Sequence, residues 1–286
     1  MKQVLIFGTK GTLGQTLVTC LDKSEEYNAI ALDKEECDIT DEKAVHKIFS
    51  QYAPDIVINA AALNAVDDIE TDDSLFERAL QINGFAPGII AQACKELDII
   101  FVHYSTDYVF DGTDTDGYKE DVVPNPLSRY AETKLKGEEE VVKVGGMYYV
   151  IRISRLFGST GSGEGSKLSF VDLMLHLAKT KDHLDIVSDQ ISSPSCALDV
   201  ADFTMRLIED HFSYGIYHGA NSGSCSWYEW AQKIFEMKNI SINLAKVPAT
   251  HFSRPAKAPM HSVLLNTKGP KQRSWKDALD EYIASK

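Results

Sequence analysis

The sequence predicts an α/β fold, a Rossmann-type doubly wound parallel sheet with a smaller C-terminal α/β portion. Short, continuously apolar segments alternate with segments whose apolar residues recur at helical spacing, which is typical of β-α-β units in a sheet covered on both faces. A glycine-rich turn directly follows the first apolar segment, as it does in many such sheets. The length of 286 residues suits a principal domain with a smaller partner.

The expected elements of the first half follow in regular order. Buried strands are expected at 4–7, 29–32, 55–59, 99–103 and 148–152. Helices are expected at 13–24, 41–52, 74–97 and 128–143. After Phe157, the run from Gly158 to Gly165 contains only glycine, serine, threonine and glutamate, so a domain boundary is expected near residue 157.

The second half is less regular. Helices are expected at 168–180, 197–210 and 226–237, mixed with short strand-like pieces. The chain is therefore divided into residues 1–157, the principal domain, and residues 158–286, the smaller portion. Residues from about 185 to 212 are expected to return to the first sheet, because second halves of this type often send elements back.

Charge and motif content exclude several classes of protein. The chain carries 29 basic and 42 acidic residues, a net charge of −13, which disfavours binding to nucleic acid or to an anionic membrane. Five widely spaced cysteines without a C-x-x-C pair, and no segment resembling a signal peptide or a membrane span, lead us to expect free thiols and a cytoplasmic protein. The eight histidines show no zinc-binding spacing, so no metal site is expected.

A G-x-x-G-x-x-G pattern stands between the first strand and the first helix. Its glycines permit a tight turn and close approach of a ligand to the backbone, while the start of the helix offers free N–H groups to a pyrophosphate. In this position the pattern favours a dinucleotide site over a purely structural turn. The candidate residues are Gly8, Lys10, Gly11, Thr12, Leu13 and Gly14.

Asp33 ends the second strand and is a candidate contact for the cofactor ribose. A carboxylate here would bond the 2′-hydroxyl of NAD, whereas the neighbouring Lys34 would suit the 2′-phosphate of NADP. An ordinary turn residue at the end of a strand is the alternative role for Asp33. The cofactor is therefore expected to be NADPH or NADH, without a choice between them.

Tyr130 and Lys134 are four residues apart, on one face of the helix expected at 128–143. The fourth strand runs into Thr106, and the carboxyl ends of such strands face the cofactor crevice, so Thr106 should converge with Tyr130. Lowering a tyrosine pKa from near 10 to about 7 requires roughly 4 kcal/mol of preferential phenolate stabilisation, which an ammonium and a cationic nicotinamide can supply. We therefore predict that Tyr130 is the general acid and that Thr106 binds the substrate oxygen. The alternative is that Tyr130 is a surface tyrosine and Lys134 a solvated lysine, with no catalytic role.

At these residues the chain resembles the extended short-chain dehydrogenase/reductases and, more narrowly, the dTDP-4-dehydrorhamnose reductase family. The likeness covers nearly the full length and is more specific than any single motif. It rests on separate stretches within 38–41, 59–67, 105–110, 130–134, 188–194 and 215–228.

The resemblance implies NAD(P)H-dependent reduction of the C4 keto group of a nucleotide-linked 4-keto-6-deoxy sugar. The first choice is dTDP-4-dehydro-L-rhamnose, reduced for cell-surface or spore-coat polysaccharide. The resemblance implies a catalytic triad of Thr106, Tyr130 and Lys134, and places Val66 and Tyr108 against the sugar. It also implies these cofactor contacts: Asp38, Ile39, Ala60, Ala61, Ala62, Tyr130 and Lys134. Tyr108 stands where related dehydratases have glutamate, which speaks against water elimination.

Several positions depart from the family pattern. Arg155 replaces a tryptophan that usually lies against the sugar, and would either bond an N-acetyl or carboxyl substituent or form a salt bridge away from the site. The loop at 161–170 is rewritten. A late arginine is missing, although Arg254 and Lys257 lie close enough in sequence to reach a diphosphate. Thr16 stands where some members have a magnesium-binding acid, so we expect no metal dependence.

Two other functions stay open. One is reduction of a different UDP- or dTDP-linked 4-keto-6-deoxy hexose with an amino substituent, which Arg155 would suit. The other is a non-catalytic NAD(P)-binding regulatory subunit, as found in a relative that regulates methionine adenosyltransferase, although Thr106, Tyr130 and Lys134 are intact here. A nucleotide sugar is the expected small-molecule partner, and the oligomeric state is left between monomer and homodimer.

Overall fold

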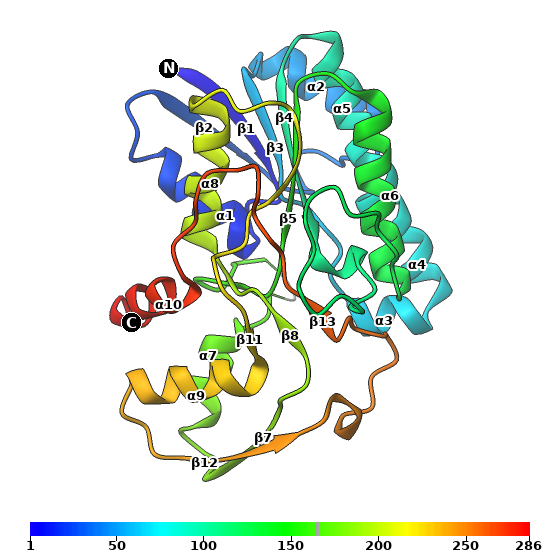
Figure 1. Ribbon diagram of the computed structural model, residues 1–286. Coiled ribbons are helices and arrows are strands. Elements are labelled where there is room, and N and C mark those ends of the chain that lie inside the picture. Colours follow the sequence, from blue (N-terminus) through cyan, green and yellow to red (C-terminus); the bar gives the residue numbers. More distant parts are fainter. Residues whose placement is uncertain (164–165) are drawn as a thin grey trace.

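The computed structural model describes residues 1–163 and 166–286 and is centred on a parallel sheet (Figure 1). Its strands are β1 (Lys2–Phe7), β2 (Tyr27–Leu32), β3 (Ile56–Asn59), β4 (Ile100–Thr106), β5 (Tyr148–Ile153) and β10 (Gly215–His218). Their order is β10-β5-β4-β3-β1-β2, and every neighbouring pair is parallel. The order reverses between β1 and β3, which confirms the predicted doubly wound sheet and marks the place where such sheets bind ligands.

Helices cover both faces of this sheet (Figure 1). On one face lie α1 (Thr12–Leu21) and α8 (Ala197–Glu209); on the other lie α2 (Glu42–Tyr52), α5 (Ala86–Glu96) and α6 (Arg129–Val144). Val4 and Ile6 of β1 pack toward the first layer, and Leu5 and Phe7 toward the second. Because successive strand residues point to opposite faces and both faces are covered, the strand must be apolar throughout.

The helix expected at 74–97 is present as one continuous helical run from Asp73 to Glu96, with a π-helical turn inside it. After α3 (Val66–Thr71), α4 (Asp73–Ala79) leads through a π-helical turn, η1 (Leu80–Phe85), into α5. Pro87 has no backbone N–H to give to the carbonyl of Asn83, so the regular ladder is interrupted there. That carbonyl packs against Gly137 of α6, where a Cβ atom would lie only 2.2 Å from the oxygen. The π turn therefore lets α6 approach closely.

The C-terminal portion is built from small sheets and short helices below the main sheet (Figure 1). Its strands are β7 (His183–Val187), β8 (Ile191–Ser192), β9 (Ser195–Cys196), β11 (Cys225–Ser226), β12 (Asn243–Val247) and β13 (His261–Ser262). Its helices are α7 (Phe170–Leu177), α9 (Trp227–Met237) and α10 (Trp275–Ala284), with a short 3-10 turn η3 (Ala249–His251). The last strand before residue 158, β6 (Leu156–Phe157), pairs with β9. Phe157, Trp230 and Trp275 share one apolar cluster, which gives this portion a core of its own.

The segment that returns to the main sheet differs in part from the expected 185–212. Within that range, α8 packs against α1, but β7 pairs with β12 outside the main sheet. The added strand is β10, which follows α8 and pairs with β5. The connection explains the difference: β10 directly follows α8, which packs on the main sheet, and its Tyr217 joins the same apolar cluster as α8.

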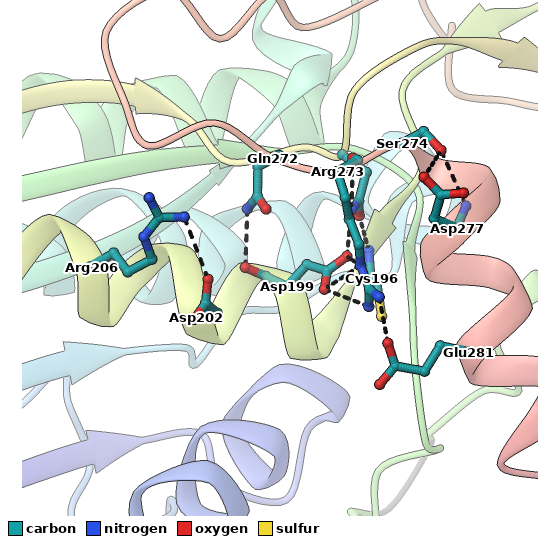
Figure 2. Close-up of polar contacts among 10 residues, drawn as sticks. Cys196, Asp199, Asp202, Arg206, Gln272, Arg273, Ser274, Asp277 and Glu281 are labelled. Carbon is teal, nitrogen blue, oxygen red and sulfur yellow. Dashed lines mark hydrogen bonds and ion pairs between the residues drawn. The ribbon is translucent and has the colours of Figure 1, made fainter.

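Arg273 ties α10 to α8 (Figure 2). Its Nε donates to both carboxylate oxygens of Asp199, at 3.0 and 2.9 Å, and its Nη1 bonds Glu281 of α10. The Tyr282 hydroxyl of the same helix donates to the Gly158 carbonyl at 2.7 Å, at the start of the rewritten loop. The C-terminal helix is thus tied to α8 and to the start of the rewritten loop, of which residues 164 and 165 lie outside the described residues.

Candidate active site

A cleft of about 1420 Å³ opens at the carboxyl ends of the central strands and is lined by both portions of the chain. Most of the predicted site residues line it: Gly8, Lys10, Gly11, Thr12, Leu13, Asp33, Asp38, Ile39, Ala60, Ala61, Ala62, Val66, Thr106, Tyr108, Tyr130, Lys134 and Arg155. Gly14, Arg254 and Lys257 are not among the described residues that line it. Residues up to 167 therefore supply most of the wall, and 190–262 close it from the other side.

The glycine loop has the shape that a bound pyrophosphate requires. Gly8 has φ +81°, and a Cβ there would lie 2.5 Å from the backbone nitrogen of Ala61, so only glycine fits. At Gly14 a Cβ would lie 2.2 Å from the Gly8 carbonyl oxygen, so this glycine allows helix α1 to pack on the strand. Gly11 begins α1 without a side-chain cap and without acidic residues in the first turn, which leaves N–H groups and partial positive charge to an anion. The loop thus fits a dinucleotide.

Asp33 supports this loop directly. Its Oδ2 accepts hydrogen bonds from the Lys10 backbone nitrogen at 2.9 Å and from the Thr9 hydroxyl at 2.6 Å. The Lys10 ammonium is paired with Glu35 at 2.7 Å at the surface. Asp33 therefore shapes the phosphate loop even where no ribose is bound, a role that strand-end position alone did not reveal.

Asp38 and Ile39 form the next part of the wall. Hydrogen bonds from the Thr40 hydroxyl, at 2.7 Å, and from its backbone nitrogen, at 3.0 Å, lower the pKa of Asp38. Ile39 is buried and belongs to the apolar cluster beneath the sheet. A charged and an apolar surface therefore lie side by side at this end of the cleft.

Tyr130 and Lys134 project from one face of α6 into the cleft, as their spacing predicts. The Lys134 ammonium is buried and donates to the backbone carbonyl of Tyr104 at 2.7 Å. Burial lowers the pKa of Lys134 to about 8, and burial raises the pKa of Tyr130. The Tyr130 hydroxyl donates to Oδ1 of Asn64 at 3.3 Å, and its ring meets that of Tyr108 edge to face, with centroids 5.9 Å apart. Asn64 was not predicted as a site residue.

Asp107 is a second residue that sequence reasoning missed. It stands in the short 3-10 turn η2 (Asp107–Val109) that follows β4, and its side chain is buried. Its Oδ2 accepts from the hydroxyls of Ser154 at 2.7 Å and Ser262 at 2.5 Å, and Oδ1 accepts from Thr106 at 3.2 Å. The position of Asp107 directly after Thr106 was the only sign in the sequence of a role in the site, because Ser154 and Ser262 are distant in the chain. The carboxylate holds Thr106 against both portions of the chain.

Arg155 lines the cleft instead of forming a salt bridge away from it, and its contact with a sugar substituent stays a prediction. Its Nη1 donates to the Cys225 carbonyl and its Nη2 to the Gln190 carbonyl, both at 2.9 Å. The guanidinium carbon lies 3.9 Å from the ring centroid of Trp227, a cation–π contact. Arg155 therefore forms a flat wall of the cleft together with Trp227, with two of its nitrogens bonded to the backbone.

The two late basic residues lie outside the lining of the cleft. Arg254 is paired with Asp67, with Nη2 3.0 Å from Oδ2, and the Lys257 side chain is exposed. A fixed counter-ion thus already compensates the charge of Arg254, which the sequence did not indicate.

The sheet, the glycine loop at its switch point and the Thr106–Tyr130–Lys134 group define an NAD(P)-dependent oxidoreductase of the extended short-chain dehydrogenase/reductase class. The chain matches the RmlD substrate binding domain family over residues 1–286. It belongs to that family.

Similar proteins span the whole chain. The spore coat polysaccharide biosynthesis protein SpsK of Bacillus subtilis is 37% identical, covering 99% of this chain and 97% of that protein. The dTDP-4-dehydrorhamnose reductase of Aggregatibacter actinomycetemcomitans is 33% identical over 99% of both. The crystal structure of a dTDP-4-dehydrorhamnose reductase from Bacillus anthracis in complex with NADP has a TM-score of 0.92 at 32% identity, covering 100% of this chain and 99% of that one. The predicted family, the predicted enzyme class and an NAD(P) cofactor are confirmed.

Two features of the described residues bear on membranes and metals. In residues 1–163 and 166–286, no helix has the length and apolar character needed to cross a bilayer. Over the same residues, no group of three or more His, Cys, Asp or Glu side chains is arranged to hold a metal ion. Metal independence stays a prediction, and EDTA should leave the rate of reduction unchanged; loss of activity with EDTA and recovery with magnesium would contradict it.

Proposed function

We propose that this enzyme reduces the C4 keto group of dTDP-4-dehydro-L-rhamnose, giving dTDP-L-rhamnose for a cell-surface or spore-coat polysaccharide. The observation that carries the proposal is the convergence of Thr106, Tyr130 and Lys134 at the switch point of the sheet, in a chain whose relatives include enzymes named for this reaction. The bound nicotinamide cofactor, in its reduced form, supplies hydride to the carbonyl carbon.

The protein supplies the proton and the charge stabilisation. Tyr130 donates its hydroxyl proton to the carbonyl oxygen as negative charge develops there, and burial keeps this hydroxyl protonated until then. The Lys134 ammonium, anchored on the Tyr104 carbonyl, stabilises the phenolate that is left. Thr106, held by Asp107, meets the same substrate oxygen.

The sugar is proposed to lie between Val66, Tyr108 and the Arg155–Trp227 wall. Arg254 and Lys257 stay our proposed contacts for the diphosphate, since the Arg254 side chain is 42% exposed despite its pairing with Asp67. Two of the five N–H donors of Arg155 bond backbone carbonyls, so fewer are left for an amino or carboxyl substituent, which stays the alternative substrate.

The test is to offer dTDP-4-dehydro-L-rhamnose and a 4-keto amino sugar, each with NADH and with NADPH. We expect the rhamnose precursor to give the larger kcat/KM with both cofactors. A larger value for the amino sugar would favour the alternative substrate. Turnover of neither, with intact NAD(P)H binding, would favour a regulatory subunit.

Activity is expected to fall as the pH rises through about 8. Because the pKa of Lys134 is lowered to about 8, the ammonium is present below that pH and is lost above it, and with it the stabilisation of the phenolate. A profile of kcat/KM against pH should show this descending limb. Lys134→Arg carries a charge that does not titrate in this range, so its slower reaction should lack the limb. A limb unchanged in that variant would assign it to another group.

We also propose a cytoplasmic location and at most a homodimer. Four of the five free cysteines are buried, which suits a reducing compartment. Light scattering of the purified protein tests the oligomeric state; a larger assembly would contradict it.

A further inference from the structure

Three short strands of the C-terminal portion form a wall of the cleft next to the catalytic group. β8 lies between β13 and β11, with Ser192 paired to Ser262 on one side and to Cys225 on the other. Residues paired across neighbouring strands point to the same face of a sheet. Ser262, Ser192 and Cys225 therefore form one row, of which the two serines line the cleft.

This row stands close to the reacting centre. The Ser262 hydroxyl donates to Oδ2 of Asp107, whose Oδ1 accepts from Thr106. Neighbouring strands are about 4.8 Å apart, so Ser192 is one strand spacing beyond Ser262. A sugar whose keto oxygen meets Thr106 and Tyr130 would extend over this distance along the row.

The Ser192 hydroxyl is buried without a hydrogen-bond partner. Its side chain is 1% exposed, and Oγ has no hydrogen-bond partner among residues 1–163 and 166–286. Buried polar groups are nearly always paired, and an unpaired one destabilises the folded protein. Ser192 also lines the cleft, so a ligand bound there would supply the missing hydrogen-bond partner.

Arg155 links the strands that carry this row through bonds to backbone carbonyls and leaves the Ser192 hydroxyl unbonded. Its two bonds go to the carbonyls of Gln190, just before β8, and of Cys225 in β11. The Trp227 indole N–H donates to the Gln190 side chain at 3.2 Å. Arg155 therefore fixes the strands on which Ser192 and Cys225 stand.

We propose that Ser192 is a sugar-binding residue, whose hydroxyl bonds a ring hydroxyl of the hexose in the nucleotide-sugar substrate. The inference rests on the proposed function and adds a determinant of substrate choice. A serine hydroxyl both donates and accepts, so it pairs with a sugar hydroxyl but gains nothing from an apolar ring position.

Ser193 provides a matched control. Its hydroxyl is also buried and without a partner among the described residues, at 1% exposure, but Ser193 is not among the described residues lining the cleft. Ser192→Ala and Ser193→Ala each remove one unpaired hydroxyl, so both variants should fold. Ser192→Ala should raise the KM for dTDP-4-dehydro-L-rhamnose about five- to thirtyfold with kcat little changed, and Ser193→Ala should leave both constants unchanged.

Inhibition by dTDP separates sugar contacts from nucleotide contacts. The inhibition constant of dTDP and the KM of NADPH should be the same in Ser192→Ala and in the wild type. An unchanged KM for the sugar substrate in Ser192→Ala, an equal rise in Ser193→Ala, or an equal loss of dTDP affinity would overturn the assignment of Ser192. A wild-type enzyme that reduces no 4-keto nucleotide sugar would instead overturn the proposed function, and this inference with it.

Discussion

Replacing Tyr130 by Phe is expected to lower kcat by about 10²–10⁴-fold while leaving NAD(P)H binding intact. The variant removes the only proton donor that we assign to the substrate oxygen. The ring stays in its apolar cluster with Ile69 and Ala79, so the fold should not change. Stopped-flow measurement of NADPH oxidation gives the rate, and quenching of tryptophan fluorescence gives the cofactor affinity.

Tyr149→Phe is the control for losing a buried tyrosine hydroxyl away from the cleft. The Tyr149 hydroxyl bonds the carbonyls of Leu207 and Phe212 and is not part of the described lining of the cleft. The kcat of the Tyr149→Phe variant should stay near that of the wild type. If Tyr130→Phe kept kcat within a few-fold of the wild type, the proton would have to come from another group and the mechanism would be wrong.

Local spacing explains why this part of the site could be predicted. Tyr130 and Lys134 share a face because four residues make about one turn of a helix, whatever surrounds it. The strands could be predicted for a similar reason, since a strand covered on both faces must be apolar at every position, as Val4 and Leu5 show.

Contacts between distant segments could not be predicted in this way. Asp107 and Ser262 are bonded although 155 positions separate them, and no periodicity links them. Arg155 follows β5 and Trp227 begins α9, so their contact depends on the tertiary fold. The φ of +43° at Arg155 is also an unusual conformation for a residue other than glycine. Pro87 interrupts the helical hydrogen bonds locally, which the sequence can show. The close packing of Gly137 against the Asn83 carbonyl that this permits depends on the tertiary fold.

The helix that carries Tyr130 and Lys134 is joined to the sheet by a buried ion pair. Nη2 of Arg152 on β5 lies 2.6 Å from Oε2 of Glu138 on α6, and Nε also donates to this carboxylate at 2.9 Å. Their side chains are 1% and 3% exposed. The Arg152 guanidinium also stacks over the Phe110 ring at 5.0 Å. A buried pair of this type adds little net stability over an apolar pair, but it leaves a costly charge when one partner is removed.

Glu138→Gln is therefore expected to destabilise the protein by about 3–5 kcal/mol and to lower Tm by about 6–20 °C. Asp202→Asn is the matched control at the surface (Figure 2), because Asp202 and Arg206 are exposed and 3.9 Å apart; it should change stability by less than about 0.5 kcal/mol. The double variant Glu138→Leu with Arg152→Met removes both charges and should recover much of the loss. Calorimetry gives the melting temperatures of the three variants. If Glu138→Gln melted at the wild-type temperature, the Arg152–Glu138 pair would not hold α6. The position of Tyr130 would then depend on the Gly137–Asn83 contact.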